Sequence, residues 1–148
     1  MKKLILILIS VISIYSVSAQ KYTDTYIKDA NKVALGWLND VNHKQYENAY
    51  NLLSKEVKVR YQQETWISII NDLMLEFGNL ENRTINQKYF QSEIEGMEDG
   101  FYVFIEYEAH YENTKEHTEY LLLKQNDKAK WEIFDYNYEF KNKKQQEK

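Results

Sequence analysis

Apolar side chains recur at two different periods along the chain, and the change between them predicts the fold. In residues 24–41 and again in residues 63–77, apolar residues return every three or four positions, the spacing of one buried helix stripe. After Gly78 the period falls to two, as in strands with one buried face. Gly78 stands where a helix end needs a left-handed residue. The pattern predicts helices before Gly78 and strands after it.

Two shorter segments separate the long helical stretches. Asn42 is predicted to cap a second helix, with Gln45 as its capping-box partner. Residues 54–61 are predicted to form a short turn or helix. The second helix is expected to bury Tyr46, Ala49, Tyr50 and Leu53. The helix at residues 63–77 is expected to bury Trp66, Ile69, Ile70, Leu73, Met74 and Phe77.

The second half predicts four antiparallel strands, at residues 82–94, 101–112, 116–125 and 130–140. The second strand alternates most clearly. Its apolar face carries Phe101, Val103, Ile105, Tyr107, Ala109 and Tyr111. Helices followed by a strand meander indicate an α+β domain, in which three N-terminal helices cover the apolar face of a four-stranded sheet.

The start of the chain has the three parts of a secretory signal peptide. Lys2 and Lys3 precede an apolar run over residues 4–17, and small residues lead to Ala19. An uncleaved membrane anchor is the alternative, but the run is shorter than the roughly 20 apolar residues that span a bilayer, which favours a signal peptide. We expect a signal peptide over residues 1–19, cleavage between Ala19 and Gln20, and export to the periplasm or the extracellular space. No membrane attachment is expected after cleavage.

Composition narrows the function classes. Without Lys2 and Lys3, 17 basic and 23 acidic side chains remain, a formal charge of −6 that disfavours nucleic acid as a partner. The absence of cysteine excludes disulfides, thiol nucleophiles and thiolate metal sites, so stability depends on packing by 13 Tyr, 6 Phe and 3 Trp. No proline or linker interrupts the chain. We therefore expect one domain over residues 20–140 and a polar disordered tail over residues 141–148.

A set of dispersed residues also carries a family likeness. The set comprises Trp37-Leu38, Asp40, Tyr46, Trp66, Gly78, Arg83, Glu95 to Val103, Thr118-Glu119 and Trp131 to Tyr136. In their order and spacing the chain resembles the bacterial secreted family "domain of unknown function 4019", over roughly residues 30–138. The resemblance implies a nuclear transport factor 2-like (cystatin-like) cone, in which a curved sheet wraps around helices. The family has no assigned activity, so it implies no catalytic residue.

Two histidines and two carboxylates form a candidate metal site. If Asn113-Thr114 is the tip of a two-residue hairpin, His110 faces His117 and Glu108 faces Glu119, a donor set that zinc could use. A slip of one residue in register would separate the set. A solvated polar face is the simpler interpretation, and we expect no metal or other cofactor.

A carboxylate in the cone is the candidate for catalysis. Other proteins of this fold perform acid–base chemistry with a group whose pKa is shifted by burial. Asp135, which would share a strand face with Trp131 and Ile133, and Glu119 are the candidates. No nucleophile, base and acid spacing defines a mechanism.

Tyrosines and an arginine form a candidate ligand site. The same hairpin register places Tyr107 opposite Tyr120, with Tyr111 one step along, where the rings could hold a flat apolar ligand. An ordinary core is the alternative. Arg83 could pair with a ligand carboxylate or with a helix acid such as Glu76.

The sequence therefore predicts a non-catalytic binding or accessory module, with an isomerase- or dehydratase-like enzyme as the alternative. The module would hold a small apolar ligand in the cone, or a protein partner on the outer sheet face. Tyr102 and Phe104, with Leu121 and Leu123 as further candidates, would form an apolar outer patch suited to a partner or a homodimer.

Overall fold

Four helices precede four strands in the computed structural model, which describes residues 2–140 and side chains from residue 22 onward. The helices are α1 (Lys2–Asn42), α2 (Tyr46–Asn51), α3 (Lys55–Arg60) and α4 (Gln63–Phe77). The strands are β1 (Leu80–Gln91), β2 (Tyr102–Tyr111), β3 (His117–Gln125) and β4 (Trp131–Phe140). The expected α+β order is confirmed, and the segment left open as a turn or helix is the helix α3.

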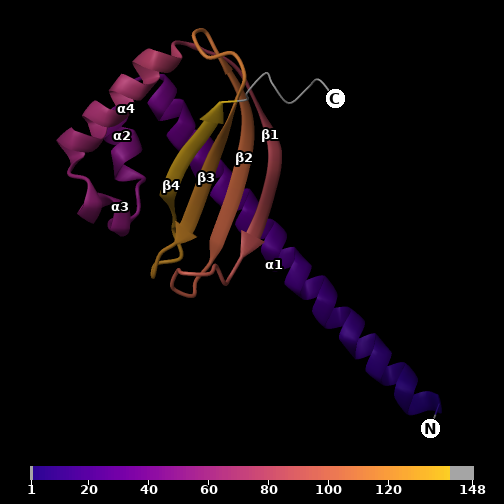
Figure 1. Ribbon diagram of the computed structural model, residues 1–148. Coiled ribbons are helices and arrows are strands. Elements are labelled where there is room, and N and C mark those ends of the chain that lie inside the picture. The colour runs from indigo at the N-terminus through magenta and orange to yellow at the C-terminus, as the bar shows by residue number, and fades with distance from the viewer. Residues whose placement is uncertain (1, 141–148) are drawn as a thin grey trace.

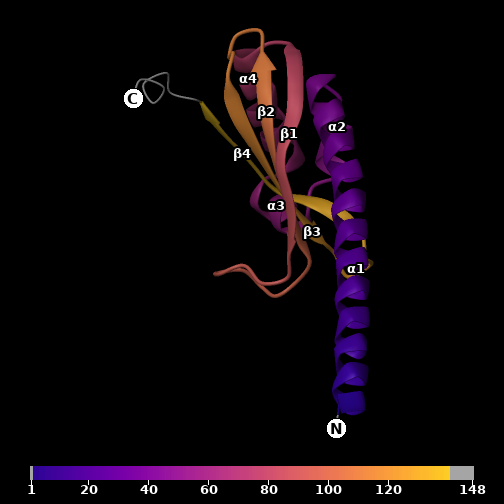
Figure 2. The same ribbon diagram turned by 90° about the vertical axis from the view of Figure 1, so that its right-hand side faces the viewer.

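The strands form one curved antiparallel sheet in the order β1-β2-β3-β4, so β1 and β4 are its edges (Figure 1). The helices lie on one side of the sheet, here called the inner face. The C-terminal half of α1 runs alongside the strands, and α2, α3 and α4 lie beyond β4 (Figures 1 and 2). The N-terminal half of α1 projects past the end of the sheet. Helices wrapped by a curved sheet make the expected cone.

Two helix boundaries can be explained from the sequence, and one predicted boundary is wrong. Gly78 ends α4 at a φ of 80°, as expected, but its ψ of −158° is extended rather than helical. Ser54 caps α3 by accepting a hydrogen bond from the Val57 N–H at 3.4 Å. The capping box at Asn42 is wrong, because α1 continues through Asn42 and the Gln45 side chain makes no capping bond. The Gln45 N–H instead bonds to the Asp40 carbonyl at 2.8 Å, which turns the chain directly into α2.

The core lies between the sheet and the helices. Along β2 the inner-face residues from Val103 to Tyr111 are at most 1 % exposed, so the predicted alternation is confirmed there. Phe101, which was also expected on this face, precedes β2 and is 40 % exposed. Large helical side chains, including Trp37, Trp66 and Phe77, pack against this face. Ile69 was expected in the core but is 51 % exposed, because it lies on the flank of α4.

The pairing of β2 with β3 differs by one residue from the predicted hairpin. Ala109 pairs with His117 and Tyr107 pairs with Glu119, whereas a two-residue turn would pair His110 with His117. Residues 112–116 form the connection instead, and it is bonded to the end of α4. The Asn113 N–H donates to the Phe77 carbonyl at 2.9 Å. This tertiary contact shapes the loop, so the strand sequence alone did not predict its length.

A bulge in β4 moves the side chains of the second part of that strand to the opposite faces of the sheet. Leu123 pairs with Ile133 and Leu122 with Asp135, so Phe134 is the extra residue. Trp131 and Ile133 therefore face inward and Asp135 faces outward. Asp135 was expected to share the face of Trp131 and Ile133, but the bulge places it on the opposite face.

Two predictions concern the ends of the chain and are not tested by the structure. The predicted tail, residues 141–148, lies outside the described residues, and so do the side chains around the predicted cleavage site. Within the part of the chain that is described, no helix combines the length and apolar character needed to cross a membrane.

Candidate functional site

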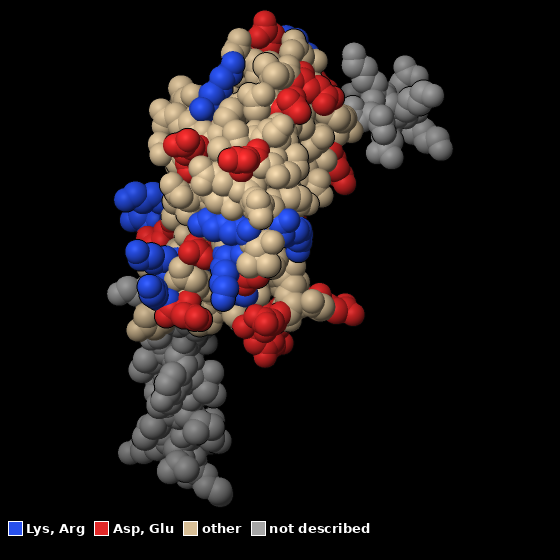
Figure 3. All heavy atoms as spheres, turned by 90° about the vertical axis from the view of Figure 1, so that its left-hand side faces the viewer, with Lys and Arg blue, Asp and Glu red and all other residues tan. Residues whose placement is uncertain are grey.

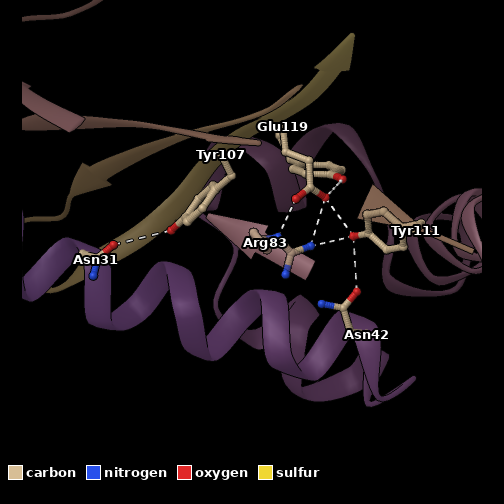
Figure 4. A network of polar contacts seen from close by, with 7 residues as sticks. Asn31, Asn42, Arg83, Tyr107, Tyr111 and Glu119 are labelled. Carbon is tan, nitrogen blue, oxygen red and sulfur yellow. Dashed lines mark hydrogen bonds and ion pairs between the residues drawn. The ribbon is translucent and has the colours of Figure 1, made fainter. Parts of the chain in front are cut away.

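A buried ion pair joins two strands on the inner face of the sheet (Figure 4). Arg83 of β1 donates from Nε to Glu119 Oε2 at 2.5 Å and from Nη2 to Oε1 at 3.0 Å. The side chains of Arg83 and Glu119 are 9 % and 0 % exposed. Ala109 of β2 lies between the two strands and pairs with Arg83. Its small side chain leaves the inner face open for the long guanidinium to reach Glu119.

Tyrosine hydroxyls complete the network around Glu119. Tyr136 and Tyr111 donate to Glu119 Oε1 at 2.8 and 2.9 Å. Arg83 Nη2 donates to the Tyr111 hydroxyl at 2.5 Å, and its guanidinium lies 5.8 Å from the centre of the Tyr111 ring. Burial, together with the Glu119 charge, raises the pKa values of Tyr111 and Tyr136 well above 10. Both hydroxyls therefore stay protonated and act as donors to the carboxylate.

The network extends to α1 at two positions. The Tyr107 hydroxyl lies 3.5 Å from Asn31 Oδ1, and the Tyr111 hydroxyl lies 3.3 Å from Asn42 Oδ1 (Figure 4). Burial raises the pKa of Tyr107 to about 12. The helix and the sheet are thus joined by polar contacts inside an otherwise apolar core, which orients α1 over the strands.

The predicted ligand site is only partly assembled. Arg83, Tyr107 and Tyr111 come together, but they are packed against Glu119 and α1 rather than lining an apolar pocket. Arg83 pairs with Glu119 and not with Glu76, because Glu119 faces the same side of the sheet. Tyr120 was expected opposite Tyr107, but the register turns it to the outer face, where its hydroxyl donates to Glu139 at 3.2 Å.

The same difference in register separates the candidate metal ligands. His110 and Glu108 point to the outer face, and His117 and Glu119 point inward. Among the described residues no group of three or more His, Asp or Glu side chains is arranged to hold a metal ion.

His117 lies in an aromatic environment instead. Its ring stacks on Tyr111 with a centroid separation of 5.1 Å and packs against Phe77 at 4.6 Å. Neither ring nitrogen makes a well-formed hydrogen bond within the described residues. Burial lowers the pKa of His117 below 6.5, so the ring is neutral at physiological pH.

The apolar side chains of the outer face are not all those expected, and they include Leu122, which pairs with Phe104. Leu121 and Leu123 were candidates for its apolar patch, but both are fully buried on the inner face. Phe104 does face outward and lies between Tyr89 and Tyr120, with ring centroids 5.0 and 6.0 Å away. Tyr102 also faces outward but is only 1 % exposed. An aromatic row, Tyr89–Phe104–Tyr120, therefore replaces the predicted leucine-containing patch.

A cleft of about 460 Å³ opens between β4 and the helices α3 and α4. Its walls are mainly aromatic and aliphatic. They comprise Trp37, Leu53, Val57, Tyr61, Trp66, Ile69, Ile70, Leu73, Ile133, Phe134, Tyr136 and Tyr138. This volume lies within the range of small-molecule pockets, roughly 300–1,000 Å³. Sequence reasoning treated the two tryptophans as core anchors and missed the cleft, because it depends on how far α4 lies from β4.

Four charged side chains also line the cleft. Arg60, the last residue of α3, is the basic residue of the lining, whereas Asp72 and Glu76 of α4 and Asp135 of β4 are acidic. On the helical side of the molecule, basic side chains gather in the lower half, at the level of α3 (Figure 3). The upper half, at the level of α4, shows mainly acidic ones. Tyr136 connects this cleft to the buried network, because it lines the cleft and also bonds to Glu119.

The family follows from a comparison with family models. The model described as "Protein of unknown function (DUF4019)" matches residues 33–136. The chain belongs to this family. The resemblance drawn from the dispersed residues is thereby confirmed.

Among solved structures, the chain is similar to the "Putative NTF2-like transpeptidase" from Campylobacter jejuni. The identity is 11%, the TM-score is 0.48, and the match covers 71% of this chain and 96% of the other. A search of curated proteins finds no match.

Proposed function

We propose that this domain is a non-catalytic binding module and that its ligand site is the cleft between β4 and the helices α3 and α4. The observation that carries the proposal is the combination of a 460 Å³ volume with a mainly apolar, aromatic lining. Such walls bind by excluding water, and the few charged groups of the lining orient the ligand. The ligand is a mainly apolar molecule with a charged group.

The interior of the cone is a less suitable place for this ligand. Glu119, His117, Tyr107 and Tyr111 are at most 1 % exposed, and their side chains pack against one another and against α1. A ligand there would have to displace an ion pair whose partners are desolvated, and an unpaired buried charge costs several kcal/mol. The cleft needs no such displacement.

The buried network also favours binding over catalysis. Glu119 accepts hydrogen bonds from Arg83, Tyr111 and Tyr136, so its oxygen atoms are occupied and no substrate proton is within reach. Asp135, the other acid candidate, lies exposed on the outward-facing side of β4. An isomerase- or dehydratase-like enzyme would need a carboxylate that is both buried and available.

The binding proposal is tested with Nile red, a neutral dye that fluoresces in apolar sites. Trp66 lines the cleft, so its emission should be quenched as the dye binds. The variant Ile69→Arg should abolish dye binding, because Ile69 is exposed and lines the cleft. Leu75→Arg is the matched control on the same helix, since Leu75 is 59 % exposed but lies outside the lining. Equal dye binding by both variants would overturn the proposal.

We further propose that the module is exported. The support is the order of Lys2, Lys3, the apolar run and Ala19, together with the position of the domain after it. Mass spectrometry of the protein recovered from outside the cytoplasm should give a chain that begins at Gln20. A full-length mass would contradict cleavage.

The aromatic row Tyr89–Phe104–Tyr120 favours a second candidate function, a homodimer formed through the outer face. Three neighbouring aromatic rings would suit a self-complementary contact. Sedimentation equilibrium should then report a dimer for the natural chain and a monomer for Phe104→Lys. A monomer in both cases rules out this candidate and leaves the cleft proposal unchanged.

A further inference from the structure

The cleft follows the edge of β4 rather than one of its faces. Side chains of successive strand residues point to opposite faces, so a pocket on one face would be lined by every second residue. Here the inward-facing residues Ile133, Tyr136 and Tyr138 line the cleft, and so does Asp135, which faces outward beyond the bulge. A lining that draws on both faces places the backbone edge of β4 along one wall of the cleft.

This edge already accepts a short neighbouring strand at one end. Leu53 forms a parallel bridge with Ile133. The Ser54 N–H donates to the Ile133 carbonyl at 2.8 Å, and the Ile133 N–H donates to the Leu52 carbonyl at 2.9 Å. Beyond Ser54 the chain turns away into α3, whereas β4 continues to Phe140. Within the described residues the sheet has no strand on the far side of β4. The Tyr138 N–H donates to the Asn137 side chain at 2.8 Å, and a peptide would have to displace that local contact to bond there.

We propose that the ligand of the cleft is an extended peptide that pairs with β4 and becomes a fifth strand of the sheet. Unpaired N–H and C=O groups on a strand edge are a template for such pairing, and adjacent pockets then select the side chains. This inference rests on the proposed function, since it specifies the ligand class of the same cleft. Residues 134–138, beyond the bridge at Ile133, would span about 13 Å of an added strand, at 3.3 Å per residue.

The chemistry of the partner follows from the opposite wall. Tyr61, Ile69 and Leu73 present apolar surface to the peptide, so the residues that face the helices should be aromatic or branched aliphatic. Asp72, Glu76 and Asp135 outnumber Arg60 among the charged residues of the lining, so a peptide with basic residues is favoured over an acidic one. The partner is therefore an extended segment of alternating apolar and polar residues that carries lysine or arginine.

The probe is the blocked heptapeptide acetyl-Lys-Phe-Thr-Val-Thr-Phe-Lys-amide, which has lysine at both ends and so suits either strand direction. Two derivatives carry N-methyl groups on alternate amides, one set for each edge of the peptide. An added strand bonds to β4 through only one of its edges. One derivative should therefore lose at least tenfold in affinity, measured by tryptophan fluorescence and calorimetry, and the other should bind like the parent peptide.

Equal affinities for the two derivatives, or no binding of the parent peptide at millimolar concentration, would overturn the added strand. The Nile red result separates this failure from failure of the binding site itself. If Ile69→Arg abolishes dye binding but the methylated peptides do not differ, the cleft binds ligands by its walls alone.

The contribution of charge is tested separately, with protein variants and the peptide that carries no N-methyl groups. In the double variant Asp72→Asn and Glu76→Gln, the affinity for the lysine peptide should fall at least fivefold, and Nile red binding should be unchanged. Glu64→Gln is the control, because Glu64 lies on the first turn of the same helix and outside the cleft lining. An equal effect of the control, or no effect of the double variant, would contradict the choice of a basic partner.

Discussion

The Tyr136 hydroxyl donates a hydrogen bond to Glu119 Oε1 at 2.8 Å, while the same residue lines the cleft between β4 and the helices. One side chain thus connects the candidate binding site with the buried ion pair of the core. The Glu119 carboxylate therefore fixes the position of Tyr136 from the core side, and Arg83 in turn fixes Glu119. This arrangement makes the wall of the cleft rigid at the point where it meets the core.

Loss of that hydroxyl should destabilise the domain. A hydrogen bond to a charged group contributes about 1.5–3 kcal/mol, so we expect Tyr136→Phe to lower the free energy of unfolding by that amount in urea titrations. The control is Tyr120→Phe, which removes a 3.2 Å bond to Glu139 on the outer face and should cost less than about 0.5 kcal/mol. Similar losses for the two variants would contradict the role given to Tyr136.

The ion pair should behave as a unit. Glu119→Leu leaves Arg83 buried without its partner, and we expect a loss of about 3–5 kcal/mol in the free energy of unfolding. Arg83→Met should cost a comparable amount. The double variant should be more stable than the sum of the single losses predicts, because no charge is left unpaired. Additive losses, measured in the same urea titrations, would show that the two side chains do not depend on each other.

The pH dependence of stability should report His117. Burial lowers its pKa below the ordinary histidine value of 6.5, so the unfolded chain takes up this proton more readily than the folded one. Stability is therefore unaffected by this group above pH 6.5 and falls as the pH drops from 6.5 toward the folded pKa. Thermal unfolding at pH 7.5 and pH 5.5 should show a smaller difference for His117→Phe than for the natural chain. His43→Gln, at an exposed position, should retain the natural difference.

Two glycines should respond in opposite directions to alanine. Gly78 has a φ of 80°, and an added Cβ would lie 2.9 Å from Asn113 Nδ2 and 3.0 Å from Glu112 Cβ. We expect Gly78→Ala to cost about 1–3 kcal/mol, because the backbone conformation suits only glycine. Gly36 lies within α1 with nothing within 4 Å of an added Cβ, so Gly36→Ala should stabilise by up to about 1 kcal/mol. Melting temperatures that shift in the same direction would contradict this assignment.

The candidate site was harder to predict than the fold because it depends on register. Tyr107 and Tyr111 were predicted on the inner face and do lie there. Glu119 was a candidate for a carboxylate in the cone and does lie inside, but the expected hairpin register placed it on the outer face, since the loop at residues 112–116 is bonded to the end of α4 rather than closed as a tight hairpin. A shift of one residue moves every side chain of β3 to the opposite face. The same shift separated the proposed metal ligands His110 and His117.

The sequence alone determined the order and type of the elements, the change from helix to strand at Gly78, the inner face of β2 and the family. Those features depend on interactions between residues close together in the chain, namely the apolar period and the conformational freedom of glycine. Tertiary structure decided the register of β3, the bulge at Phe134 and the cleft along β4. Each of these depends on contacts between segments distant in sequence, such as Phe77 with Asn113 and Ser54 with Ile133, and no local pattern specifies the distance at which such segments meet.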